Sequence, residues 1–170
     1  MQRASERARS RPRSRCDVAA GRLTRGGPSV RERLRWELTP EQYRRIRRLW
    51  IRHALAEDRR DIDALVATLA PDCAYEIVPT AQRWTGHGGA RAFYRELFEA
   101  FPDNAFALTD IVIGPQGVFE VATLTATNLG PWARMPASGL PVRIEVLIHF
   151  PWDRDAGLFT GERIWLGGSP

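Results

Sequence analysis

Apolar side chains follow a helical period in three places between residues 39 and 101. They recur three or four positions apart, as expected for helices with one buried face. The first helix begins at Thr39-Pro40-Glu41-Gln42, which combines an N-cap threonine, a proline at the first helical position and a capping-box glutamine. The pattern predicts helices over 39–58, Asp61–Leu69 and Gly88–Phe101, with a short strand over Cys73–Val78.

The period changes to two after Phe101, where apolar and polar residues alternate. This alternation predicts four strands, separated by turns that are rich in glycine, proline and aspartate: Ala105–Ile113, Val118–Asn128, Val142–Phe150 and Phe159–Leu166. Helices followed by a run of antiparallel strands indicate an α+β fold. We therefore expect a strongly bent, mostly antiparallel sheet whose inner face is covered by three N-terminal helices.

Charge is distributed unevenly along the 170 residues, whose formal net charge is +5. The first 35 residues contain eleven arginines against three acids, and the remainder has three more acids than arginines. Residues 1–38 also contain few large apolar side chains, too few to offset the entropy of ordering. We expect residues 1–38 to be a disordered tail and 39–170 to be the folded domain. A weak nucleic-acid arm, a transit peptide and a start codon placed too far upstream stay open as interpretations of the tail.

Several other classes do not fit the sequence. The two cysteines, Cys16 and Cys73, suggest neither a disulfide framework nor a zinc site, so a reducing cytoplasmic compartment is expected. No apolar run approaches the length of a membrane span. No glycine-rich phosphate loop follows a strand, and the histidines and acids lack metal-ligand spacing. We therefore expect no membrane contact, no metal and no cofactor.

Four local strings, taken in order, carry a family resemblance over about 130 residues. They are Ala56-Glu57-Asp58-Arg59-Arg60-Asp61-Ile62-Asp63-Ala64-Leu65, Leu69-Ala70-Pro71-Asp72-Cys73-Ala74-Tyr75-Glu76, Gly86 to Asp103, and Gly157-Leu158-Phe159-Thr160-Gly161-Glu162-Arg163. The chain resembles the SnoaL-like branch of the nuclear-transport-factor-two-like superfamily. The resemblance implies a cone-like α+β barrel with a deep pocket, often in a homodimer. Members include polyketide cyclases, ketosteroid isomerase, scytalone dehydratase and non-catalytic binders, so the fold alone does not decide the function.

The resemblance and the strand parity together suggest candidate site residues. Glu162 is the expected general base or acid, with His53 and Tyr75 as its partners or as oxyanion donors. A carboxylate among apolar walls would have a raised pKa. The expected ligand is a small apolar molecule, and its pocket is expected to include Trp50, Ile77, Trp84, Tyr94, Asn128, Trp132, Ile148 and Ile164.

The sequence also departs from the family. Ile77 and Ile148 stand where ketosteroid isomerase has its two acids, so that enzyme's own mechanism is not expected. The favoured function is cofactor-free proton transfer of the isomerase, cyclase, dehydratase or hydrolase type. The alternative is a non-catalytic ligand-binding or dimerisation module. Strand parity places Glu145 and His149 on the outer face of the sheet, which with Trp165 is the expected homodimer interface.

Overall fold

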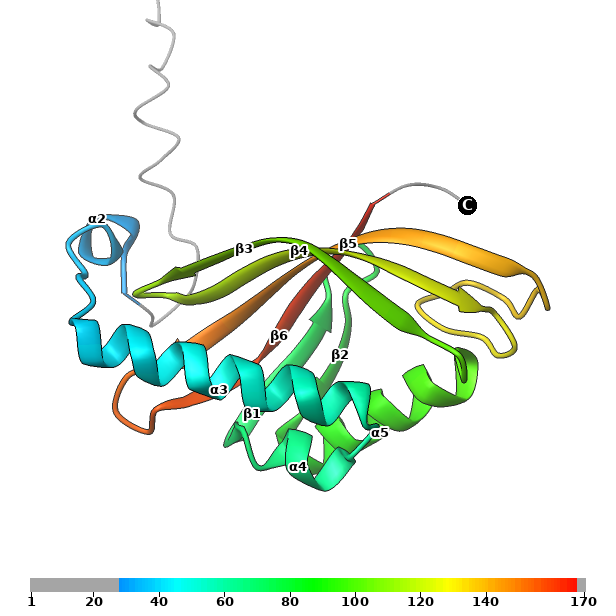
Figure 1. Ribbon diagram of the computed structural model, residues 1–170, viewed down its shortest axis with the longest axis horizontal. Helices are drawn as coiled ribbons and strands as arrows, with labels where there is room; N and C mark the ends of the chain where they lie inside the picture. Colours follow the sequence, from blue (N-terminus) through cyan, green and yellow to red (C-terminus); the bar gives the residue numbers. More distant parts are fainter. Residues whose placement is uncertain (1–27, 168–170) are drawn as a thin grey trace, which may run out of the picture. The chain divides into compact units, whose positions relative to one another are not determined.

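A single six-stranded sheet organises the folded part of the chain. The computed structural model describes residues 28–167, in which the strands run in the order β2-β1-β6-β5-β4-β3. All neighbouring strands are antiparallel except β1 and β6, which are parallel. The strand bounds are β1 Leu69–Ile77, β2 Gln82–Thr85, β3 Ala105–Gly114, β4 Gly117–Thr127, β5 Pro141–Asp153 and β6 Leu158–Gly167. The sheet is strongly curled but not closed into the expected barrel, because β2 and β3 remain its edges (Figure 1).

Three helices lie on the concave side of this sheet: α3 Pro40–Asp58, α4 Ile62–Val66 and α5 Gly86–Ala100 (Figure 1). Helix α3 begins as predicted, since Thr39 and Gln42 exchange the two hydrogen bonds of a capping box. The α+β prediction is confirmed. The core lies between helices and sheet, and its largest fully buried side chains include Tyr75, Tyr94, Phe93, Phe101, Phe150 and Phe159.

Two local predictions were wrong. The second helix ends at Val66 rather than Leu69, because Leu69 instead starts β1 and pairs with Phe159 of β6. A short apolar run fits either a helix end or a buried strand, and periodicity cannot separate the two. The residues Trp84-Thr85-Gly86 have the composition of a turn, and a turn is the sequence-based prediction for them, but Trp84 and Thr85 lie in the short strand β2, which pairs with β1. β2 is a strand because it pairs with β1, which precedes it in the chain. Its own sequence of apolar and polar residues does not predict a strand.

The chain divides into two compact units, Met1–Trp36 and Glu37–Pro170. Within the first unit, the short helix α2 (Val30–Arg33) is capped by Ser29, although it lies in the segment 1–38 for which disorder was predicted. The predicted disorder of residues 1–27 lies outside the described residues, so it stays a prediction. No helix among residues 28–167 is both long and apolar enough to cross a membrane.

Candidate functional site

Glu162 lies at the centre of a buried polar cluster. The parallel pairing of β1 and β6 sets Tyr75 directly beside Glu162, and both side chains face the helices. Although only 3% exposed, Glu162 has no arginine partner in the described ion pairs. Its Oε1 atom accepts a hydrogen bond from the Tyr94 hydroxyl at 2.7 Å and lies 3.0 Å from His53 Nε2. Residues from α3, α5, β1 and β6 therefore meet at one carboxyl group.

The imidazole ring of His53 is held by hydrogen-bond contacts on both of its nitrogens. The hydroxyl of Thr68 donates its one proton to the carbonyl of Leu65 at 2.6 Å. Thr68 Oγ1 can therefore only accept from His53 Nδ1, which lies 2.6 Å away, so Nδ1 carries a proton. On the other side of the ring, His53 Nε2 lies 2.8 Å from the Tyr94 hydroxyl and 3.0 Å from Glu162 Oε1. An imidazole, a phenol and a carboxyl group therefore meet within hydrogen-bond distance, which is the arrangement that a proton-transfer site needs.

Two tyrosines complete this cluster. The hydroxyl groups of Tyr75 and Tyr94 lie 3.1 Å apart, and Tyr94 continues to Glu162. Burial, followed by the nearby Glu162 charge, raises the pKa of both phenols well above their ordinary value. Both therefore remain protonated at neutral pH and act as hydrogen-bond donors. Tyr75 reaches Glu162 through Tyr94, which makes Tyr75 a positioning residue.

A small cavity borders the cluster. Its volume is about 20 Å³, room for about one water molecule. Most of its walls are apolar or aromatic, and two carboxyl groups interrupt them; the lining residues are Glu57, Phe93, Leu97, Phe106, Leu124, Trp132, Val146, Ile148, Glu162 and Ile164. The hydrogen bonds to Glu162 from Tyr94 and His53 both involve Oε1.

Glu57 and Glu120 were not among the sequence candidates. Glu57 is half-buried on α3, one turn after His53, and burial followed by the charges of Glu162 and Glu120 raises its pKa well above the ordinary value. Glu120 faces inward from β4 and accepts a hydrogen bond from Trp50 Nε1 at 2.7 Å. Burial raises the pKa of Glu120 to about 7. Strand parity could have found Glu120, which alternates with Val118 and Ala122 on the inner face.

The raised pKa of Glu120 makes the stability of the fold dependent on pH. The group titrates near 4.5 when unfolded and near 7 when folded. Between these values the native state holds a proton that the unfolded state has lost, so rising pH favours unfolding. We expect Glu120→Gln to be more stable than the wild type by about 3 kcal/mol at pH 8 and about equal to it at pH 4. Urea unfolding at both pH values measures the difference.

An exposed acid provides the control for this comparison. Glu99 lies on the solvent side of α5, and Glu99→Gln should follow the wild type at both pH values. A residual loss of stability with rising pH is expected to persist in Glu120→Gln, because the pKa of Glu57 is raised as well. Identical unfolding of Glu120→Gln and the wild type at pH 8 would contradict the assignment of Glu120.

Of the remaining residues predicted to line the pocket, some line the cavity and others do not. Ile148 and Ile164 line the cavity, whereas Ile77 is buried in the core away from its lining. Trp84 does not line it either; its indole N–H donates to Glu96 at 3.2 Å. Asn128 is buried and donates to the Pro136 carbonyl, so this side chain holds a loop instead of facing the cavity.

The outer face of the sheet contains Glu145, His149 and Trp165, as strand parity predicted. Glu145 is exposed there, and the Arg163 guanidinium stacks 5.1 Å from the Trp165 ring. His149 is on the same face but is buried by parallel stacking on Phe119, with ring centroids 4.0 Å apart. His149 also lies within hydrogen-bond distance of the Gln116 carbonyl. These contacts lie on the opposite face of the sheet from the Glu162 cluster.

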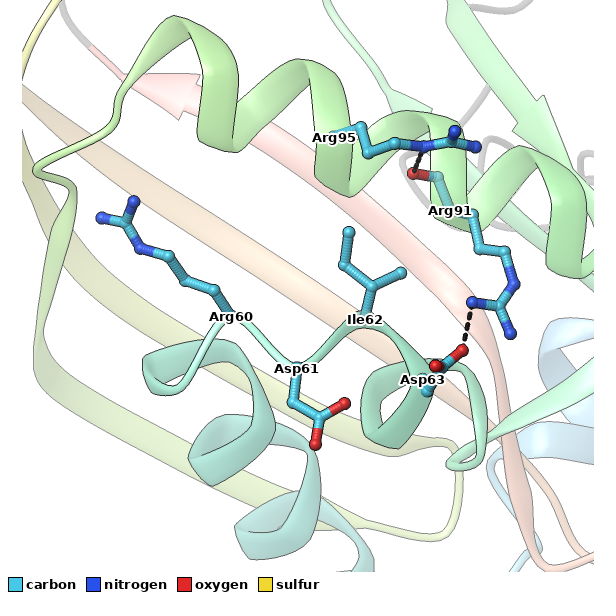
Figure 2. A pocket seen from close by; sticks show the side chains of 6 residues that line it. All are labelled: Arg60, Asp61, Ile62, Asp63, Arg91 and Arg95. Carbon is cyan, nitrogen blue, oxygen red and sulfur yellow. Dashed lines mark hydrogen bonds and ion pairs between the residues drawn. The ribbon is translucent and has the colours of Figure 1, made fainter.

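A larger hollow of about 480 Å³ lies on the surface between α4 and α5 (Figure 2). Arg91 is paired there with Asp63, and the Arg95 Nε–H donates to the Arg91 carbonyl. The guanidinium groups of Arg60 and Arg95 point to opposite sides of the hollow (Figure 2). Since the cations do not converge, this hollow lacks the geometry of an anion site. Among residues 28–167, no group of three His, Cys, Asp or Glu is placed to hold a metal ion.

Solved structures with the same fold carry different descriptions. The chain is 21% identical to a provisionally named SnoaL-like polyketide cyclase from Jannaschia sp. CCS1, with 77% of this chain and 90% of that one aligned and a TM-score of 0.62. A provisionally named hydroxylase from Streptomyces galilaeus is 16% identical, over 74% and 90% of the two chains, with a TM-score of 0.59. An NTF2-like protein of unknown function from Burkholderia pseudomallei K96243 is 15% identical, over 71% and 88%, with a TM-score of 0.59.

At these identities the likeness establishes the fold and leaves the reaction open. No functionally curated protein matches the chain. The sequence model of the SnoaL-like domain matches residues 48–160, which include the second half of α3, helices α4 and α5, and strands β1 to β5. This match covers well over half of the chain, and the fold agrees with it: the chain belongs to the SnoaL-like domain family.

Proposed function

We propose that this protein is an enzyme that moves protons within a small, largely apolar substrate, without a cofactor. The observation that carries the proposal is the buried contact of 3.0 Å between His53 Nε2 and Glu162 Oε1, beside a cavity with largely apolar walls. Burying a carboxyl group is costly unless it is hydrogen-bonded or paired, and the partner here is a titratable group instead of an arginine. A buried pair of titratable groups lowers the stability of the fold, but it can serve acid–base chemistry.

In the proposed reaction, the Glu162 carboxylate removes a proton from the substrate. The electron pair of the broken bond moves into the substrate, and the proton is returned to a different atom of the same molecule. His53 exchanges its proton with Glu162, and Tyr94 donates to the same carboxylate oxygen. Isomerisation and cyclisation follow from this cycle directly. In a dehydration the returned proton goes to a hydroxyl group of the substrate, which leaves as water, and in a hydrolysis Glu162 removes the proton from a water molecule that attacks the substrate while the leaving group receives the proton. The Glu162 cluster does not discriminate among them.

Substrate size follows from the cavity. Because its volume is about 20 Å³, a substrate larger than water must displace wall side chains. Phe106 on the edge strand β3 is only half-buried and is the wall residue that we expect to move first. We place the reaction in the cytoplasm, a placement that the buried, unbridged thiol of Cys73 supports.

The test is a ligand and turnover screen on the wild type and on Glu162→Gln. A library of small ketones, hydroxyketones, epoxides and enol ethers is assayed by thermal shift and by proton–deuterium exchange of ligand hydrogens in heavy water. We expect ligands that stabilise both proteins but exchange hydrogens only in the presence of the wild type. Binding without exchange or turnover in either protein would favour the alternative, a non-catalytic ligand-binding module.

We propose further that a second copy of the chain covers the outer face of the sheet. Cross-strand pairing joins Val112 to Phe119 and links Val121, Leu147 and Trp165 in the adjacent row. Four of these five side chains are large hydrophobics that are more than one-third exposed, and Trp165 is partly buried. A contiguous apolar patch of this kind marks an interaction surface. Glu145 and His149 lie on the same face.

We expect sedimentation equilibrium to give the mass of two chains for the wild type. The Val121→Glu substitution should lower it to the mass of one chain, because an unpaired carboxylate would be buried at the interface. As a control, Leu55→Glu alters an exposed leucine on α3 and should leave the dimer intact. A single-chain mass for the wild type at every concentration would rule out this dimer.

A further inference from the structure

The indole N–H of Trp132 is a buried hydrogen-bond donor with no acceptor. Trp132 is only 6% exposed and lines the same cavity as Glu162. Its Nε1 atom has no hydrogen-bond partner among residues 28–167. Leaving such a group unpaired costs about 1–3 kcal/mol, so native structures rarely contain one without a reason. A ligand acceptor in the cavity would provide that reason.

Trp132 begins a tight turn whose backbone is strained, and the turn fixes the position of the residue. Trp132 and Met135 exchange two backbone hydrogen bonds of 3.0 and 2.7 Å across a tight turn. The two residues between them, Ala133 and Arg134, have φ values of +51° and +65°. Neither is glycine, so each costs about 1–2 kcal/mol in this conformation. Strained backbone of this kind concentrates at ligand-binding positions.

Aromatic packing holds the indole from two sides. The ring centroid of Trp132 lies 5.6 Å from that of Phe101 and 6.2 Å from that of Phe93. Phe93 is itself a wall of the cavity. The turn and the two phenylalanines thus fix an unsatisfied donor beside a space that also borders Glu57 and Glu162.

We propose that Trp132 is the anchoring residue for the ligand, donating its indole N–H to an acceptor oxygen of an uncharged molecule. This inference rests on the proposed function, since it assumes that a small molecule enters the cavity. A carbonyl or ether oxygen fits because the N–H requires an acceptor. A carboxylate does not fit, because no arginine or lysine lines the cavity to offset its charge. The ligand body rests on the apolar walls, while the oxygen determines its orientation.

Two probes of nearly the same shape isolate the proposed hydrogen bond. Acetophenone carries a carbonyl oxygen, and α-methylstyrene replaces that oxygen with a CH₂ group. We expect the wild type to bind acetophenone about tenfold more tightly, as estimated for one buried hydrogen bond to an otherwise unsatisfied donor. In Trp132→Phe, which keeps an aromatic ring but lacks the N–H, this preference should disappear.

Trp152 provides a matched control. Its indole Nε1 is also buried without a partner, yet Trp152 does not line the cavity. Trp152→Phe should keep the full preference for acetophenone. If Trp132→Phe fails to fold, the wild type is still informative, because the chain contains six tryptophans whose indole N–H resonances can be followed by nitrogen-15 NMR. Acetophenone should move the Trp132 resonance downfield, and α-methylstyrene should not.

The outcomes separate this inference from the proposed function. Equal binding of the two probes, with no change at the Trp132 N–H, overturns the anchoring role and leaves the proton-transfer proposal standing. If neither probe perturbs any cavity resonance, the anchoring role is overturned for oxygenated aromatic ligands. In that case the exchange assay with Glu162→Gln still decides the proposed function independently. Loss of the acetophenone preference in Trp152→Phe would also contradict the inference.

Discussion

Glu162→Gln is expected to slow turnover by a factor of about 10²–10⁴. Glutamine has nearly the same shape and can still accept the hydrogen bond from Tyr94 through its amide oxygen. It cannot take up a proton, so it cannot act as the base that the proposed reaction requires, although it still lies within reach of His53 Nε2. Binding of the substrate should change far less than the rate. Initial rates and ligand affinity, measured on the same preparation, separate the two effects.

The control for this substitution is Glu145→Gln. Glu145 is exposed on β5, and its side chain points away from the cavity. It should therefore retain the wild-type rate. Equal turnover in Glu162→Gln and the wild type would remove Glu162 from the mechanism. A joint loss of binding and rate would instead indicate that the carboxyl group has a structural role in the cluster.

Gly161→Ala is expected to destabilise the fold by on the order of 4 kcal/mol or more. Gly161 has a φ of +115°, a conformation that residues with a Cβ atom rarely adopt. An added Cβ would lie 2.0 Å from the carbonyl oxygen of Ala74 on the neighbouring strand β1. Neither backbone can move without disturbing the pairing of Tyr75 with Glu162, one residue further along. The substitution should therefore damage the site as well as the fold.

Thermal and urea unfolding measure the loss in Gly161→Ala. Gly88→Ala is the matched control, because a Cβ added at Gly88 in helix α5 would meet nothing within 4 Å. Removing a glycine from a helix should stabilise the protein by about 0.5–1 kcal/mol. Near-wild-type stability of Gly161→Ala would mean that β1 and β6 tolerate a wider separation than the structure indicates.

The candidate site was partly predictable from the alternation along individual strands. Parity placed Glu145 on the outer face of β5, because successive side chains of a strand point to opposite sides. In β6 it grouped Glu162 with Ile164 and Leu166, and the family resemblance indicated that this face is the inner one. The same rule applied to β4 would have selected Glu120. Parity cannot show which inward-facing groups touch, since contacts such as His53 with Glu162 join residues 109 positions apart.

The hydrophobic pattern by itself determined the fold class, the bounds of α3 and the order of most elements, because local periodicity and capping depend on neighbouring residues alone. Only the tertiary structure decided the chemistry. Thr68, whose hydroxyl holds the imidazole nitrogen of His53, and Trp132, whose indole N–H lacks an acceptor, show no distinguishing pattern in the sequence. Hydrogen-bond partners and unfilled donors depend on which distant segments meet, and β1 pairs with β6, which comes from the other end of the domain.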